Sequence, residues 1–267
     1  MSNRLLVTLC TYNERENLGL LIPEIQRFAP QADLLVVDDN SPDGTGQLAD
    51  EMAAADPRIH VLHRPGKQGL GTAILAGFRY GIEQGYDLLI NLDADFSHHP
   101  RHIPQLLDCM ARADVAIGSR YVPGGGVVGW GFKRHFMSQG INWYARLFLG
   151  LTTRDNSGSY RCYRINKLAQ LDLDRFRSRG YAFQEEALYR CRQLDCIMEE
   201  TPILFEDRRL GVSKISLKEP LEAFRVIFQL GCDRLRGVSV RKPDPSGLTS
   251  GAADQPPSDQ SPAGLRA

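Results

Sequence analysis

Short apolar runs alternate with amphipathic stretches as far as residue 121, and this alternation restricts the possible folds more than any other feature. Residues 17–28 carry apolar side chains on one helical stripe, further helices are expected to end near 55 and 84, and another begins near Pro100. The runs typical of buried strands are 4–9, 33–37, 58–63, 86–93 and 114–119. Strands and helices in this order predict an α/β fold with a mostly parallel, Rossmann-like sheet and helices on both faces.

The pattern changes after residue 121. Glycines make 122–131 a flexible loop, and the elements expected beyond it are helices at 134–150 and 181–194, strands at 158–164 and 196–207, and a last amphipathic helix at about 216–236. The C-terminal residues are rich in Pro, Ser, Gly and Ala, with almost no large apolar side chains to build a core. We predict one folded domain at 1–238 and a disordered tail at 239–267.

Charge and cysteine content exclude several classes of protein. Lys plus Arg and Asp plus Glu each number 32, so the formal net charge is zero and no nucleic-acid partner is expected. None of the six cysteines forms a C-x-x-C pair, which predicts reduced thiols in a reducing compartment. We read no signal peptide at the N-terminus and no apolar run long enough for a membrane span, so a cytoplasmic location is expected.

Paired carboxylates close the fourth predicted strand. Asp93 and Asp95 are two residues apart, and side chains at that spacing in an extended chain point the same way. Carboxylate oxygens suit Mg²⁺ or Mn²⁺, and a solvated strand end is the alternative interpretation. The pair is therefore a candidate metal site.

A second acidic motif, "DDNSPDGT", follows the second predicted strand. A carboxylate at such a strand end commonly binds ribose hydroxyls or a base edge, which makes Asp39 a candidate ligand of a nucleotide. Asp43 or Ser41 is expected to cap the next helix. Because ligands of parallel sheets bind at the carboxyl ends of strands, we predict that "CTYNE", "DDNSPDGT" and "DAD" converge on one crevice.

Other motifs favour structural interpretations. The glycines of "RPGKQGLGTA" do not match G-x-G-x-x-G and favour a tight turn into a helix. His98, His99 and His102 have no cysteine at ligand spacing, so hydrogen-bonded structure is favoured over zinc. No G-x-x-x-x-G-K-[ST] loop is present, which argues against a P-loop ATPase.

Several basic residues follow predicted strand ends or flank flexible loops. Single surface arginines are usually solvated, but a substrate that carries phosphate would need cations at such positions. They are Arg120, Lys133, Arg134, Arg208, Arg209 and Lys214.

Two amphipathic helices are candidates for contact with a membrane. The aromatic stripe at 132–148, which begins beside Lys133 and Arg134, is expected to lie in a membrane interface. The terminal helix, with Leu221, Phe224, Ile227, Phe228 and Leu235, is expected to contact the core or a partner. Core packing against the sheet is the alternative for both.

These motifs together resemble the dolichyl-phosphate (polyprenyl-phosphate) mannosyltransferases, inverting family 2 glycosyltransferases with a GT-A fold. The similarity runs from about residue 5 to 235, and "DADFSHHP" and "GGGVVGW" are most similar to the soluble eukaryotic-type catalytic subunit. The matching stretches are "TYNERENL", "DDNSPDGT", "QGLGTA", "DADFSHHP", "GSRY", "GGGVVGW", "SGSYRCYR", "GYAFQ" and "DRRLGVSK".

The resemblance implies roles for individual residues. Asp93 and Asp95, with Ser97, would hold Mg²⁺ or Mn²⁺, and Arg120, Arg134 and Arg208 would contact the acceptor phosphate. The catalytic residues would be Asp95, Arg120 and Arg208. The nucleotide sugar would be bound by Cys10, Tyr12, Glu14, Val37, Asp39, Asp93, Ala94, Asp95, Arg120, Arg208 and Lys214.

The chain departs from the family at three of these motifs. Cys10 stands where proline is usual, and Asn40 replaces a common glycine at a position where Asn tolerates positive φ. Ser97 stands where some relatives have Gln.

The reaction implied is inverting transfer of mannose from GDP-mannose to dolichyl or polyprenyl phosphate. The resemblance also implies a location on the cytoplasmic face of a membrane and a possible small membrane partner subunit. Two alternatives stay open: another donor, such as UDP-glucose, and a catalytically silent nucleotide-binding scaffold.

Overall fold

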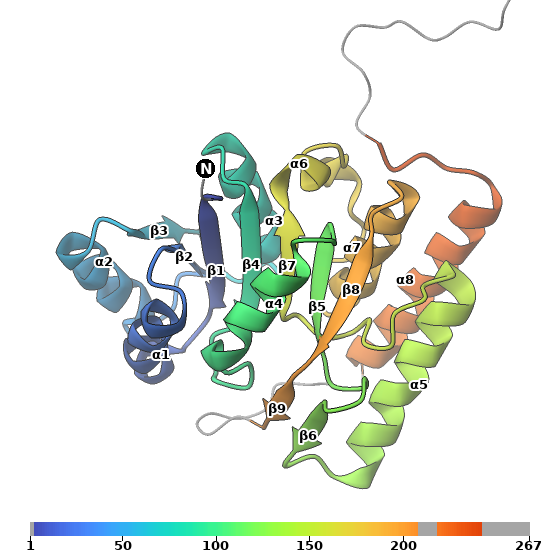
Figure 1. Ribbon diagram of the computed structural model, residues 1–267, viewed down its shortest axis with the longest axis horizontal. Coiled ribbons are helices and arrows are strands. Elements are labelled where there is room, and N and C mark those ends of the chain that lie inside the picture. Colours follow the sequence, from blue (N-terminus) through green and yellow to red (C-terminus); the bar gives the residue numbers. More distant parts are fainter. Residues whose placement is uncertain (1–2, 208–217, 242–267) are drawn as a thin grey trace, which may run out of the picture.

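A seven-stranded sheet forms the centre of the computed structural model, which describes residues 3–207 and 218–241 (Figure 1). Of these strands only β7 runs antiparallel to its neighbours, β4 and β5. The predicted mostly parallel sheet is therefore confirmed. The strand order is β3 (Ile59–His63), β2 (Asp33–Asp38), β1 (Leu5–Thr11), β4 (Leu88–Asp93), β7 (Arg161–Arg164), β5 (Val115–Ser119) and β8 (Met198–Pro202).

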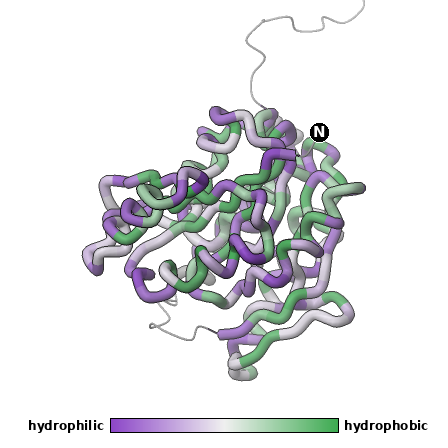
Figure 2. Tube along the Cα trace, turned by 60° about the vertical axis from the view of Figure 1, so that its left-hand side comes forward, coloured by the Kyte–Doolittle hydropathy of each residue, from purple (hydrophilic) through white to green (hydrophobic). Residues whose placement is uncertain are grey.

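Helices cover both faces of the sheet, as predicted. Leu5 and Val7 of β1 pack into one core, and Leu6 between them packs into the other, because successive side chains of a strand point to opposite faces. The first core is covered by α1 (Arg15–Phe28), α2 (Thr45–Ala55) and α4 (Ile103–Cys109). The second is covered by α3 (Leu70–Glu83), α5 (Phe132–Leu149), α7 (Phe183–Gln193) and α8 (Lys218–Leu235). Hydrophobic segments accordingly run through the interior in Figure 2.

Short elements complete the chain. They are η1 (Pro100–His102), α6 (Ile165–Leu168) and η2 (Leu173–Arg175). The predicted helix near Pro100 thus starts as a 3₁₀ turn that leads into α4. The other helices predicted from periodicity are confirmed to within a few residues.

The strand predicted at 196–207 is wrong as a single element. Its first part, β8, pairs with β5 in the central sheet. Its last part, β9 (Leu204–Glu206), pairs with β6 (Gly126–Val128) in a separate two-stranded sheet. Ile203 lies between them and donates its backbone N–H to the carbonyl of Ser119. Pro202, which has no backbone N–H, ends β8 at this junction.

Two long helices, α5 and α8, lie against each other at one end of the sheet (Figure 1). Aromatic rings join them: Tyr144 contacts Phe224 with ring centroids 4.8 Å apart, and Phe148 contacts Phe228 at 5.9 Å. In the described part of the chain, neither these helices nor any other combine the length and apolar character needed to cross a bilayer.

The folded chain extends past the predicted domain boundary at 238. Val240 is buried, and Arg241 forms a β-bridge with Leu171. The tail predicted as disordered otherwise falls at 242–267, outside the described residues.

Candidate active site

Three neighbouring strands place one row of residues at the carboxyl edge of the sheet. Cys10 of β1 lies between Val37 of β2 and Asp93 of β4 in the parallel registers. One step further along, the backbone N–H of Asp39 donates to the carbonyl of Thr11 at 3.1 Å. The predicted convergence of the three polar motifs on this edge is therefore confirmed.

The loop after β1 is held against the neighbouring loops. Lys67 places its Nζ 4.9 Å from the centre of the Tyr12 ring. Glu14 donates its backbone N–H to Thr45 Oγ1 at 3.0 Å, and its own Oε2 accepts a hydrogen bond from Asn17 at 2.7 Å. Both predicted nucleotide-binding residues, Tyr12 and Glu14, thus lie at the same end of the sheet as Asp39.

Asp39 forms a largely buried ion pair with Arg64. The distance from Oδ1 to Nη1 is 2.8 Å, and the two side chains are 8% and 9% exposed. Burial raises the pKa of Asp39, and the guanidinium of Arg64 opposes that rise. The two paired atoms are inaccessible to solvent and make no hydrogen bond of good geometry to a described residue, so they are held together by their opposite charges.

Cys10 contributes an uncharged side chain to this row. Burial, followed by the nearby charges of Asp39 and Asp93, raises the pKa of its thiol. The side chain therefore stays protonated near neutral pH, and a protonated thiol is a poor ligand for a metal ion.

Asp93 ends β4 with its side chain 35% exposed. Its Oδ1 accepts a hydrogen bond of 2.6 Å from the hydroxyl of Ser159, and its backbone N–H donates to Nδ1 of His98. His98 is buried against the rings of Tyr160 and Phe205, and burial lowers its pKa. The histidine is thus neutral, hydrogen-bonded structure, as predicted.

Asp95 sits in the tight turn that follows Asp93. Its Oδ1 accepts from both the backbone N–H and the hydroxyl of Ser97, at 3.1 and 2.6 Å. Phe96 between them has φ +63°, and the neighbouring Ala94 is buried in the core below. This turn fixes the orientation of the Asp95 carboxylate, and Ser97 reaches it through its hydroxyl.

The oxygen donors of this turn fit a hard divalent ion. Asp93 and Asp95 offer carboxylates, Ser97 adds a hydroxyl, and Cys10 beside them is protonated. Mg²⁺ typically takes one or two protein carboxylates and completes its shell with substrate phosphates and water. The small number of protein ligands in this turn therefore matches the way Mg²⁺ is usually bound.

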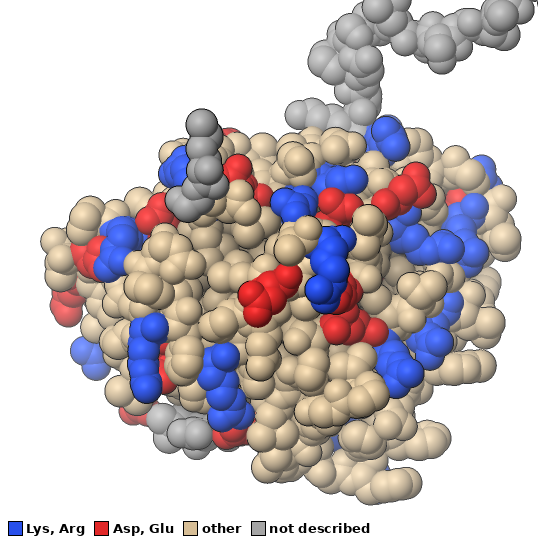
Figure 3. Space-filling view, viewed as in Figure 1, with Lys and Arg blue, Asp and Glu red and all other residues tan. Residues whose placement is uncertain are grey.

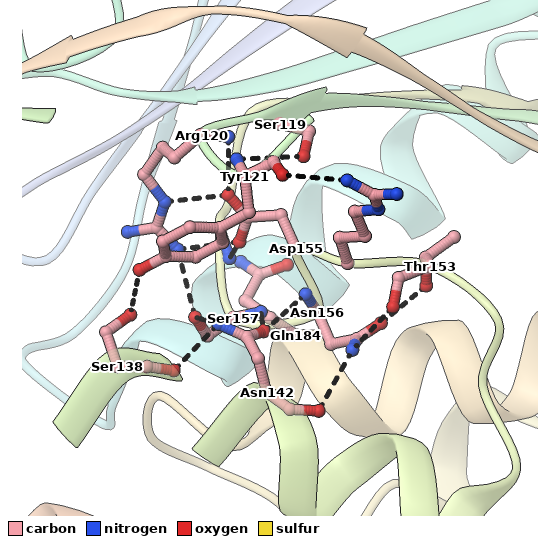
Figure 4. Close-up of polar contacts among 12 residues, drawn as sticks. Ser119, Arg120, Tyr121, Ser138, Asn142, Thr153, Asp155, Asn156, Ser157 and Gln184 are labelled. Carbon is pink, nitrogen blue, oxygen red and sulfur yellow. Dashed lines mark hydrogen bonds and ion pairs between the residues drawn. The ribbon is translucent and has the colours of Figure 1, made fainter. Parts of the chain in front are cut away.

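Arg120, which follows β5, is bound by Asp155 (Figure 4). Nε donates to Oδ2 at 2.7 Å and Nη2 to Oδ1 at 2.6 Å, and Nη2 also donates to Ser157. Burial disfavours both charges, but their mutual attraction outweighs it, so the pKa of Asp155 is lowered and that of Arg120 raised. Among the described residues, Nη1 of Arg120 has no hydrogen-bond partner, which leaves one edge of the guanidinium able to donate to a further acceptor.

One loop connects this arginine with the strand-end carboxylates. Asp155 binds Arg120, and Ser159, four residues later, binds Asp93. The backbone N–H of Gly158 donates to Asp155 Oδ1 at 3.0 Å, which keeps the loop tight. The two halves of the candidate site therefore share one support.

The remaining predicted phosphate contacts are only partly described. Arg134 lies in the first turn of α5, pairs with Asp207 at 3.0 Å and lies 4.2 Å from the ring of Trp130. Arg120 lies 5.2 Å from the same ring, so the structure brings these two arginines close together. Arg208 and Lys214 fall outside the described residues.

Sequence reasoning missed three residues that support the site. Arg64 was read only as part of a turn, and Asp155 and Ser159 were not singled out. "SGSYRCYR" marked the segment that contains Ser159, but only the fold shows that its hydroxyl reaches Asp93. The expected positive φ of Asn40 is confirmed at +56°.

The fold and the site define a glycosyltransferase: the chain belongs to glycosyl transferase family 2, whose model matches residues 6–172. It is 47% identical over 243 residues to polyprenol monophosphomannose synthase of Mycolicibacterium smegmatis, covering 89% of this chain and 92% of that protein. It is 48% identical over 213 residues to undecaprenyl-phosphate mannosyltransferase of Micrococcus luteus, covering 80% and 88%. The predicted resemblance to polyprenyl-phosphate mannosyltransferases is confirmed.

A solved structure supports the fold. Glucosyl-3-phosphoglycerate synthase from Mycobacterium tuberculosis, in complex with Mn²⁺, UDP-glucose and phosphoglyceric acid, is similar at a TM-score of 0.60. The match covers 87% of this chain and 80% of that one at 17% identity. The predicted GT-A-like architecture is thereby confirmed.

Proposed function

We propose that this chain transfers mannose from GDP-mannose to a polyprenyl phosphate, with inversion at the anomeric carbon. The observation that carries the proposal is the gathering of Asp39, Asp93 and Asp95 at one sheet edge, with Arg120 bound by the loop that also binds Asp93. The names of the relatives in Mycolicibacterium smegmatis and Micrococcus luteus supply the sugar and the lipid phosphate.

The donor would lie along the row formed by β2, β1 and β4. Asp39 would accept hydrogen bonds from the nucleoside, and Tyr12 and Glu14 lie at the same end of the sheet. Asp93 and Asp95, with Ser97 orienting the second carboxylate, would hold Mg²⁺ or Mn²⁺ beside the diphosphate. When bound, that ion supplies positive charge that stabilises the leaving diphosphate.

The acceptor needs positioning more than activation. A phosphate monoester has a second pKa of about 6, so it is already a nucleophilic anion at neutral pH and requires no general base. Arg120 and Arg134 would hold this anion close to the donor against the repulsion between the two groups, together with Arg208 and Lys214. Single displacement then gives a β-mannosyl phospholipid.

The lipid tail of the proposed acceptor would bring the enzyme to a membrane. Helix α5 exposes Phe132, Phe136, Trp143 and Leu147, which are 84%, 68%, 64% and 58% exposed. Their spacing puts them on one side of the helix, and Figure 3 shows few charged side chains at the lower right, where this helix runs. We assign this face to the membrane interface, on the cytoplasmic side.

Helix α8 has a different role. Val226, Ile227 and Leu230 are buried in the core, which agrees with the expected core contact. Leu221 and Leu235, at its two ends, are 69% and 88% exposed. These ends are where a small membrane partner subunit would bind.

Transfer of labelled sugar tests the function. The purified chain is incubated with labelled GDP-mannose, a polyprenyl phosphate and Mg²⁺ or Mn²⁺, with parallel arms that contain UDP-glucose or EDTA. Label is expected in the lipid from GDP-mannose alone, and EDTA is expected to block it. The Asp95→Asn variant serves as the inactive protein control.

Two results would contradict the proposal. Transfer from UDP-glucose but not GDP-mannose would replace the donor and keep the acceptor and the site. Donor binding without transfer to any polyprenyl phosphate, with membranes supplied, would favour the nucleotide-binding scaffold.

A further inference from the structure

A cavity of about 290 Å³ lies beside α5, and its lining includes none of the strand-end carboxylates. Four residues on successive turns of α5 form one wall, and the segment after the helix and the residue after Arg120 form the other. The lining residues are Tyr121, Gln139, Asn142, Trp143, Arg146 and Arg154.

The two arginines give this cavity a positive charge. Arg146 and Arg154 are both exposed, and neither guanidinium forms an ion pair within residues 3–207 and 218–241. The only polar contact of the Arg154 guanidinium there is a long one, 3.5 Å, to the carbonyl of Tyr121. Glu200 lies nearby, but its carboxylate accepts from the backbone N–H groups of Arg154 and Asp155.

The floor of the cavity is rigid. Asn142 is buried, its Nδ2 donates to the carbonyl of Ser138, and its Oδ1 accepts from the backbone N–H groups of Asn156 and Ser157. The hydroxyl of Tyr121 donates to Ser138 at 2.7 Å (Figure 4). The two arginines are therefore presented above a fixed polar surface.

Trp143 connects the cavity to the apolar face of α5. It lines the cavity and is also 64% exposed, on the same side of the helix as Phe136 and Leu147. Tryptophan prefers the interface between lipid and water, where arginine finds phosphate at the same depth. When α5 lies on a membrane with Trp143 in the interface, Arg146 and Arg154 therefore lie at the depth of the lipid phosphates.

We propose that this cavity binds the phosphate headgroup of an anionic membrane phospholipid, as a docking site separate from the acceptor site. The inference rests on the membrane contact in the proposed function and adds the ligand chemistry and the residues. Arginine forks match phosphate oxygens in pairs, and a volume of about 290 Å³ holds a glycerophosphate group, since a water molecule occupies about 30 Å³.

The docking site sets the position of the catalytic edge. Tyr121 lines the cavity, and its ring lies 5.3 Å from the guanidinium carbon of Arg120. Asn142 below it holds Ser157, which accepts a hydrogen bond from Arg120. A headgroup bound here fixes the height of Arg120 above the lipid surface, where the acceptor phosphate arrives.

Vesicle flotation with the full chain tests the site, without donor or polyprenyl phosphate. Vesicles of phosphatidylcholine alone are compared with vesicles that also contain phosphatidylglycerol. The Arg146→Gln/Arg154→Gln variant is expected to bind the phosphatidylglycerol vesicles about 30-fold more weakly and the phosphatidylcholine vesicles unchanged. Its transferase activity in detergent micelles is expected to equal that of the wild type.

Two further variants separate the pocket from general charge. Arg27→Gln/Arg79→Gln removes the same charge from exposed positions on α1 and α3 and is expected to bind like the wild type. Arg146→Lys/Arg154→Lys keeps the charge but loses the paired hydrogen bonds, so it is expected to recover only part of the binding.

Three outcomes would overturn the assignment. Unchanged vesicle binding by the glutamine variant would remove the site, and full binding by the lysine variant would replace the pocket by diffuse attraction. A raised KM for polyprenyl phosphate in detergent would make the cavity part of the acceptor site. Because flotation needs neither donor nor acceptor, failure of the proposed reaction would not affect this test.

Discussion

Asp155 grips Arg120 through both carboxylate oxygens, with distances of 2.7 Å to Nε and 2.6 Å to Nη2. The side chains are 0% and 6% exposed, so solvent does not screen the pair. A guanidinium that is held on one side in this way presents its other edge in a fixed direction.

Replacing Asp155 by Asn is expected to destabilise the fold. The change leaves the buried guanidinium of Arg120 without its counter-charge, which costs about 3–5 kcal/mol in buried pairs. Urea denaturation measures the loss, and Asp108→Asn, at an exposed position of α4, is the matched control. A loss no greater than that of the control would contradict the structural role of the pair.

Replacing Ser159 by Ala is expected to weaken metal binding about 10–100-fold, because the carboxylate of Asp93 loses the hydrogen bond that orients it. Calorimetric titration with Mn²⁺ in the presence of GDP gives the affinity. Ser157→Ala removes a hydroxyl from the same loop, but this hydroxyl contacts Arg120 and not Asp93. The metal affinity of Ser157→Ala should therefore match that of the wild type. Equal affinities for all three proteins would exclude Ser159 from positioning Asp93.

Replacing Asp93 by Asn is expected to lower kcat for sugar transfer by about 10²-fold or more, since the change removes a charge that holds the divalent ion in the proposed site. Its side chain is 35% exposed, so the folded structure should persist and circular dichroism should be unchanged. The activity of Asp108→Asn gives the baseline. Full activity of Asp93→Asn at saturating Mg²⁺ would remove this residue from the metal site.

The stability of the folded protein is expected to depend on pH through the buried carboxyl group of Glu185. Burial raises its pKa from 4.5 to about 7, and its Oε2 has no hydrogen-bond partner among the described residues. The folded state therefore holds a proton that the unfolded state releases, so this group's contribution to stability is complete below pH 4.5 and is lost as the pH rises to about 7.

The Glu185→Gln variant should accordingly gain up to about 3 kcal/mol over the wild type at alkaline pH and show no gain at acid pH. Thermal melts across this range measure the difference. Glu83→Gln, at an exposed position of α3, should follow the wild-type curve. A gain that does not depend on pH would assign the effect to packing instead of proton binding.

Periodicity and strand-end chemistry were enough to predict most of the fold. The strands β1, β2, β4 and β5 are short apolar runs, because they are buried on both faces. The motifs after β1, β2 and β4 meet at the edge that the parallel topology requires. The antiparallel direction of β7 and the division at Ile203 were not readable, because both depend on partners far away in the sequence.

The supports of the site were harder to predict than its ligands. Asp93 and Asp95 can be recognised in the sequence because they are charged residues at the end of an apolar strand. Asp155 and Ser159 lie in a polar loop where such residues are ordinary, and their partners are 35 and 66 residues away. Nothing local distinguishes a carboxylate that binds solvent from one that binds a buried arginine.

The loop from Asp155 to Ser159 has a consequence for protein engineering. Suppose that only the strand ends are transferred onto another α/β scaffold. Asp93 and Arg120 would then be present, but both side chains would be free to rotate. The loop has to be transferred together with these two residues, because it orients both the carboxylate of Asp93 and the guanidinium of Arg120. A shift of this short segment would disturb the carboxylate of Asp93 and the guanidinium of Arg120 together.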